Sequence, residues 1–312
     1  MSASSALTRP RRRRRNSAAA RANRDGLLMV GPTVVIVVAV VVLPVLWNVV
    51  LSFQSLSLVQ IHTSGIFGEF TLDNFTKVLA DPDFWASLRT TVIYAVGGTA
   101  GSIALGLVAA LALRRRFPGR GVVRAAMLLP YVAPVVAVAF VWQMMLNSQF
   151  GVVNIWGQKL LGWNGPVDFL GQAPYALVTV IAFEIWRYFP FAFLFITARL
   201  QAVPGDIEEA ALVDGATPTQ RFAYVLLPQL ANVIALLSVL RLIMNFNKFD
   251  DVYLLTGGGA GTDVAAVRVY DYLTGQFDVG GAAAQALVLA AILVGFLLIY
   301  VKFFVRKEVD AS

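Results

Sequence analysis

The sequence predicts an all-α polytopic membrane protein with six transmembrane helices. Three observations support this: 58% of the 312 residues are hydrophobic, only 14% are charged, and six separate apolar segments occur along the chain. Ordinary soluble domains are about half apolar and about a quarter charged. A bilayer is crossed by roughly 20 mostly apolar residues, and each of the six segments approaches that length.

The first of these segments follows a run of arginines, as the apolar core of a signal peptide would. Its apolar stretch runs for about 25 residues, whereas a signal core has roughly 7 to 15, so we predict a retained helix. The six predicted spans are approximately Leu27 to Leu51, Thr91 to Leu113, Ala125 to Leu146, Ala176 to Ala198, Leu226 to Met244 and Ala282 to Val301.

The basic residues between the spans predict the orientation. With the amino terminus inside, the cytoplasmic segments contain 18 lysines and arginines, whereas the outer loops contain Lys77, Lys159 and Arg268, with Arg89 and Lys248 close to the span ends. Cytoplasmic loops of membrane proteins carry an excess of basic residues. We therefore expect both termini in the cytoplasm and the chain in the plasma membrane of a bacterial cell.

The predicted organisation follows from these spans. A basic amino-terminal tail is expected to be disordered, and the long outer loops are expected to carry short surface helices. The units are a cytoplasmic tail (1–26), the first span (27–51), an outer loop (52–90), a core with five spans (91–305) that includes a cytoplasmic segment (201–228), and a second tail (306–312).

Composition excludes several kinds of chemistry. The chain has no cysteine and a single histidine, His62, so we predict no metal site, no catalytic residue and no cofactor. The net charge of +7 does not indicate nucleic acid, because eight arginines lie in the first 26 residues. Gly257 to Gly259 resemble part of a phosphate loop, but no lysine follows them, so we predict a turn.

The cytoplasmic segment 201–228 predicts two short helices joined by a turn. Asp206 can cap the first helix, and Gly215 can adopt the left-handed conformation that ends it. Thr217 can cap the second helix, with Pro218 at its first position and Gln220 three residues after the cap.

The residues Glu209, Ala210, Ala211, Asp214 and Gly215, followed by Phe222, Val225, Leu227 and Pro228, resemble the EAA signature of bacterial ABC import permeases. The resemblance implies the type I importer permease fold. It also implies that the first helix couples transport to a separate ATPase by docking into it, with Glu209, Ala210, Ala211, Asp214 and Gly215 as the coupling residues. An Asn232 stands where the family often has a second proline.

A second resemblance concerns the substrate. The run from Asn245 to Gly259, with Trp186 and Phe189 to Phe191 upstream, is similar to carbohydrate-importing permeases of the same family, in particular to the larger permease of maltose-type importers. This implies import of a sugar or sugar derivative by alternating access. The implied partners are a second permease, two ATPase subunits, an extracytoplasmic solute-binding protein and membrane lipid.

Two alternatives remain open from the residues alone. The chain could be an ABC permease for another small polar solute, or a secondary transporter, which would explain the spans but not the segment around Glu209. An intramembrane enzyme is disfavoured, because the single histidine lies in an outer loop and Asp250 and Asp251 are adjacent and so point to different faces.

Charged residues at membrane depth are costly unless they are paired or line a wet cavity, so they indicate candidate substrate contacts. Arg241, Asn245 and Lys248 fall on one face of the fifth span, and Tyr188 and Phe191 lie one turn apart on the fourth. The family resemblance places these five residues where relatives face sugar, although Arg241 and Lys248 add positive charge that would suit an anionic sugar. Glu184 is expected either to pair locally with Arg187 or to pair with Arg241. The polar stripe of Arg241, Asn245 and Lys248 could instead only pack against neighbouring helices, without contacting substrate.

Overall fold

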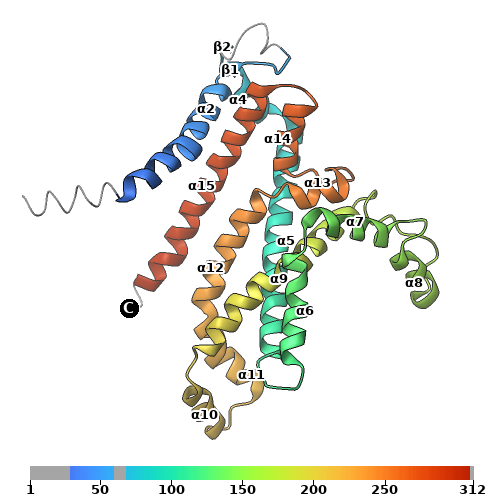
Figure 1. The fold of residues 1–312 in the computed structure, drawn as a ribbon, viewed down its shortest axis with the longest axis vertical. Coiled ribbons are helices and arrows are strands. Elements are labelled where there is room, and N and C mark those ends of the chain that lie inside the picture. The colour runs from blue at the N-terminus through green and yellow to red at the C-terminus, as the bar shows by residue number, and fades with distance from the viewer. Residues whose placement is uncertain (1–28, 60–67, 310–312) are drawn as a thin grey trace, which may run out of the picture.

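A computed structural model of the chain describes residues 29–59 and 68–309. The basic tail 1–26, the first two residues of the predicted first span and the final residues 310–312 lie outside the described residues. The described chain is almost entirely helical, with long helices running between two ends of the molecule (Figure 1). Five helices are long and apolar enough to span a membrane, and one bent pair completes a set of six.

The six spans agree with the predicted number, and their bounds differ in detail. The first runs from Met29 to Ser52 and contains a π-helical turn (η1, Val38–Val42) before α2 (Leu43–Ser52). The others are α5 (Pro82–Ala112), the pair α6 (Arg120–Val132) and α7 (Val135–Leu146), α9 (Tyr175–Gln201), the continuous run α11 (Pro218–Gln220), η2 (Arg221–Leu226) and α12 (Leu227–Phe246), and α15 (Val279–Val309).

The predicted third span, Ala125 to Leu146, is a bent pair of helices. The chain bends by 96° between α6 and α7, where Ala133 and Pro134 are extended. A proline lacks the N–H for helical bonding and pushes the preceding residue out of the helical region, so this pair ends α6. The Ala133 carbonyl, released from the helix, accepts a hydrogen bond from Nη1 of Arg187 at 3.2 Å. Such compensation is what allows a broken helix within a membrane.

The outer segments carry the expected short elements. The first outer loop contributes a two-stranded antiparallel sheet, β1 (Gln54–Ser55) and β2 (Glu69–Phe70), and then α4 (Asp73–Ala80). The other outer segments contain α8 (Val152–Leu161), α13 (Asp250–Thr256) and α14 (Ala265–Thr274). Short helices are thus present in the outer loops as predicted, although α13 is not a surface helix, because Asp251, Val252 and Leu255 are buried. The sheet was not predicted. Positive φ angles at Gly257 and Gly258 confirm the predicted turn.

The centre of the bundle is the close packing of α5 along α9. Small residues make it close: a side chain at Gly106 would meet Ala192 and the backbone of Phe193, and one at Gly101 would meet Ile185. Without a hydrophobic driving force between helices in lipid, small residues permit the backbone approach that holds spans together.

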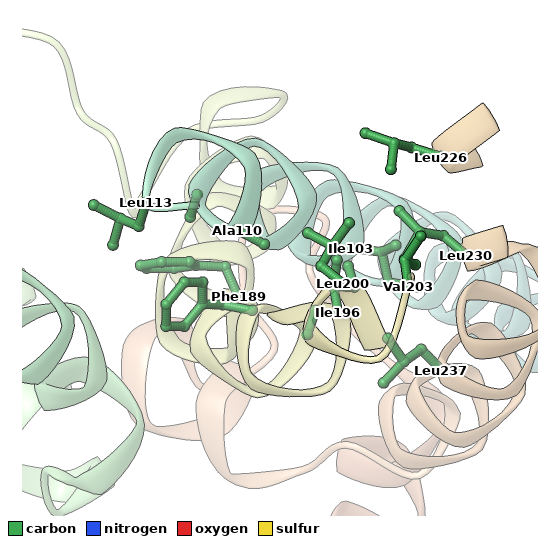
Figure 2. Close-up of a cluster of buried hydrophobic side chains, with 13 residues drawn as sticks. Ile103, Ala110, Leu113, Phe189, Ile196, Leu200, Val203, Leu226, Leu230 and Leu237 are labelled. Carbon is green, nitrogen blue, oxygen red and sulfur yellow. The ribbon is translucent and has the colours of Figure 1, made fainter. Parts of the chain in front are cut away.

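A buried apolar cluster binds this pair to α12 at the opposite end from the sheet. Figure 2 shows Ile103 and Ala110 of α5 beside Ile196 and Leu200 of α9, with side chains near α12 completing the contact. Val203 and Leu226, which flank the segment 205–220, are both buried in the same cluster. That segment, with α10 (Gly205–Val213), therefore projects from the bundle on two anchored stems at the end far from β1 and β2 (Figure 1).

Candidate functional site

The structure contains two candidate sites, an exposed helical elbow and a buried polar network. The elbow begins with α10, and its predicted cap was wrong: the helix starts at Gly205, directly after the extended Pro204, and no side chain caps it. Asp206 therefore lies inside the first turn. Its negative charge is still favourable there, since the amino-terminal end of a helix carries partial positive charge.

The end of α10 matches the prediction. Gly215 has φ of +77°, and the amide of Ala216 donates to the carbonyl of Ala211 at 2.9 Å, which closes a Schellman turn. Thr217 and Gln220 then form the expected reciprocal capping box, with Pro218 as the first helical residue. The elbow is thus a short helix with a fixed exit, which is a rigid element rather than a loose loop.

The predicted coupling residues lie on the outside of this elbow. Glu209, Ala210, Asp214 and Gly215 are exposed and Ala211 is half-buried. Leu212 and Val213 beside them are also solvent-exposed, at 52% and 88%. A short apolar surface framed by one glutamate is suited to docking on another protein.

An ion pair that sequence reasoning missed holds α10 in place. Arg114, just beyond the end of α5, donates through Nη1 to Oε2 of Glu208 at 2.7 Å and through Nη2 to the other carboxylate oxygen. The bidentate hydrogen bond from Arg114 lowers the pKa of the Glu208 carboxyl. The side chain of the neighbouring Glu209, by contrast, makes no hydrogen bond or ion pair within the residues described.

The polar network lies between α5, α9 and α12. Arg241 of α12 forms an ion pair with Glu184 of α9, and both side chains are almost completely buried. Tyr94 donates to the second oxygen of Glu184 at 3.1 Å. Asn245 accepts from Arg241 at 3.0 Å and donates to Thr99 at 3.1 Å. Three spans are therefore joined by one chain of hydrogen bonds.

Tyr188 lies at the edge of this network. The guanidinium of Arg241 is 4.1 Å from the centre of its ring, and Nζ of Lys248 lies 2.5 Å from its hydroxyl. Lys248 is also 3.0 Å from Asp250 and 3.4 Å from Asp251. A tyrosine ring attracts cations through its negative face, so the ring ties the two basic residues together.

The structure brings four of the five predicted substrate residues together: Tyr188, Arg241, Asn245 and Lys248. Phe191 lies apart and connects to Tyr188 through Tyr131, whose ring centre is 5.9 Å from that of Tyr188 and 6.0 Å from that of Phe191. Arg241 and Asn245 are each only 1% exposed, whereas Lys248 is half-buried. Whether these residues contact substrate stays a prediction.

Of the two pairings expected for Glu184, the one with Arg241 is observed and the local one with Arg187 is wrong. Glu184 faces α12, while Arg187 faces the break after α6 and lies 3.9 Å from Asp251. Tyr94, Thr99 and Asp251 complete the network but were not predicted as site residues. Tyr94 and Thr99 could not be singled out, because a threonine or tyrosine in an apolar helix is common and its facing partner is set by packing.

Comparison with known proteins identifies the family. The family model described as the binding-protein-dependent transport system inner membrane component matches residues 102–310. The chain belongs to this family. It is therefore a multi-pass inner-membrane component of such a transport system, and the alternatives of a secondary transporter and an intramembrane enzyme are set aside.

Relatives and a solved structure agree with this. The chain is 36% identical to the inner membrane ABC transporter permease YcjO of Escherichia coli over 92% of this chain and 94% of that protein. It is 33% identical to the trehalose/maltose permease MalF of Thermococcus litoralis over 89% and 92%. A crystal structure of a bacterial ABC transporter that imports the acidic polysaccharide alginate has the same fold, with a TM-score of 0.79, 21% identity and coverage of 93% and 99%.

Proposed function

We propose that the chain is one permease subunit of an ATP-driven importer that moves a sugar or sugar derivative into the cytoplasm by alternating access. The observation that carries this proposal is the rigid, exposed elbow of α10 and Gly215 in a chain of this family. In this proposal the chain works with a second permease, two ATPase subunits and an extracytoplasmic binding protein. Both termini and α10 lie on the cytoplasmic side, in accord with the excess of basic residues there.

The elbow can transmit movement because both of its stems are anchored. Val203 leads into α10 from the end of α9, and Leu226 is the last residue of η2, directly before α12. Both side chains are buried in one apolar cluster. Displacement of α10 by an ATPase would thus move α9 against α12. These are the two helices that carry Glu184 and Arg241, so motion at the elbow reaches the polar network.

The charges of the network favour a neutral sugar. Three basic residues, Arg187, Arg241 and Lys248, are matched in the ion pairs described above by three acidic ones, Glu184, Asp250 and Asp251. No positive charge is left over for an anionic group, contrary to the suggestion from Arg241 and Lys248 alone. Tyr188 and Phe191 can stack on the apolar faces of a sugar ring. The trehalose/maltose permease among the relatives is consistent with such a substrate.

Reconstitution of the whole importer tests this proposal. Proteoliposomes containing both permeases, the ATPase and the binding protein should take up trehalose or maltose only with ATP, and an excess of a sugar phosphate should not compete. Uptake without the ATPase would refute the importer assignment. ATP-dependent uptake of another small solute, with no sugar transported, would retain the importer and refute the sugar.

A further inference from the structure

A basic cavity of about 480 Å³ lies beside the elbow and shares only Arg114 with it. Its wall contains four arginines, Arg114, Arg116, Arg120 and Arg124, together with Thr197 and Gln201 of α9. The cavity lies where α5 ends at Ala112 and α6 begins at Arg120. It is therefore at the boundary between the spans and the water on the elbow side.

The cavity has far more positive than negative charge. Among the described residues, the ion pairs of these arginines are limited to that of Arg114 with Glu208. Arg124 donates to the carbonyl of Leu113 at 3.4 Å, and Arg116 and Arg120 have no acidic partner in the described chain. Arg120 and Arg124 are four residues apart, so they lie on the same face of α6. Three guanidinium groups thus share one hollow without a counter-charge.

Two further features point to an anion. The helix α6 has 13 residues and begins after Gly119, whose φ is +83° and which has no side chain to cap it, so the first amides of α6 add partial positive charge. The hydroxyl of Thr197 is buried and has no hydrogen-bond partner within the described residues. A hydroxyl and guanidinium forks are donors that phosphate oxygens accept from.

We propose that this cavity binds a phosphate group, carried either by an anionic phospholipid of the cytoplasmic leaflet or by a soluble phosphate compound. The position of the cavity favours the lipid: Ala110 and Leu200 of its wall belong to the last turns of two spans, so the hollow lies at the depth of the headgroups. Basic pockets between span ends on the cytoplasmic side are suited to such headgroups. An acidic residue of the ATPase is the competing occupant.

The intact importer in nanodiscs of phosphatidylcholine with phosphatidylglycerol provides the test. Native mass spectrometry should detect retained phosphatidylglycerol, and Arg120→Gln and Arg124→Gln should each reduce retention about fivefold. Arg115→Gln is the matched control, because Arg115 is exposed in the same loop and is absent from the cavity wall. The readout is binding, so it does not depend on which solute is transported.

The outcomes separate the sources of phosphate. Loss of phosphatidylglycerol in the Arg120 and Arg124 variants, unaffected by inorganic phosphate, supports the lipid. Displacement of the lipid by inorganic phosphate, or binding of inorganic phosphate alone that these variants lose, supports a soluble compound. Retention equal to that of Arg115→Gln overturns the proposal. The proposal is also overturned if the Arg120 and Arg124 variants fail to bind the ATPase subunit but bind phosphate and lipid as before. The arginines would then form ion pairs with a carboxylate of the ATPase.

Discussion

Arg241 and Glu184 form an ion pair between α12 and α9 in which the side chains are 1% and 0% exposed. Two charges inside a membrane bundle are tolerable only because each neutralises the other and both have further hydrogen bonds, from Tyr94 and to Asn245. The pair therefore holds together the two helices that flank the elbow, and the first prediction concerns its removal.

Glu184→Gln should strongly destabilise the subunit, because Arg241 would remain charged and buried without its partner. Breaking a buried pair by removing one member costs about 3–5 kcal/mol. Thermal unfolding of the purified importer should show a lower melting temperature. The double variant Glu184→Gln with Arg241→Met should recover part of the loss, since no charge is left unpaired. If the single variant melts at the wild-type temperature, the pair does not hold α9 to α12.

Tyr188→Phe should weaken substrate use without affecting stability to the same degree. The variant keeps the ring beneath Arg241 but removes the hydroxyl that lies 2.5 Å from Lys248. The variant also lacks the hydroxyl that we propose binds the sugar, and a hydrogen bond contributes about 0.5–1.5 kcal/mol, so we expect a roughly two- to tenfold increase in the sugar concentration giving half-maximal uptake. Tyr175→Phe, at the exposed start of the same helix, is the control. Equal uptake curves for both variants would remove Tyr188 from the site.

Cysteine labelling can decide whether the stripe on α12 meets the transport pathway, and the native chain has no cysteine. Lys248→Cys should react with a water-soluble thiol reagent, because that side chain is 12% exposed. Arg241→Cys, at 1%, should react only in a state of the ATP cycle that separates α9 from α12. Leu240→Cys is a control on the lipid or partner side and should stay unreactive. If the cysteines at positions 241 and 248 do not react in any state of the ATP cycle, these residues only pack against neighbouring helices.

The spans could be predicted from the sequence because their length and apolar content are local properties. The break at Ala133 and Pro134 could not. Pro130 and Pro190 lie inside α6 and α9, and neither ends its helix, so a proline alone does not say where a span breaks. What distinguishes Pro134 is Arg187, which comes from another helix and binds the carbonyl released at the break.

The same distinction applies to the two candidate sites. Gly215 and the capping box of Thr217 and Gln220 were predictable, since each depends on residues within six positions of one another. The partner of Glu184 was not fixed, because Arg187 is three residues away and Arg241 is 57 residues away, and only helix packing selects between them. The basic cavity beside the elbow could not be predicted for the same reason, because its wall comes from three helices.

Gly215→Arg should abolish ATP-driven uptake while the importer still assembles in the membrane. Nothing lies within 4 Å of a side chain placed at Gly215, so steric clash inside the subunit is not the cause. The cause is the φ of +77°, which a residue with a side chain adopts at a cost of about 1–2 kcal/mol, together with bulk on the docking surface. Gly215→Ala, which adds the strain with little bulk, should retain partial uptake. Normal uptake by Gly215→Arg at wild-type abundance would contradict the coupling role.

The pair of Arg114 and Glu208 provides the last prediction, because it fixes α10 to the end of α5. Arg114→Glu should uncouple ATP hydrolysis from uptake by placing two carboxylates together and freeing α10. The charge-exchanged variant, Arg114→Glu with Glu208→Arg, should restore coupling in part. Adding Glu209→Arg to Arg114→Glu should not, since Glu209 points away from this pair.

The pKa of Glu208 is lowered, so the stabilisation from this ion pair is fully present at neutral pH and is lost only as the pH falls through that lowered pKa. Uptake per ATP hydrolysed is the quantity to measure, and an unchanged ratio in Arg114→Glu would show that α10 does not need this anchor.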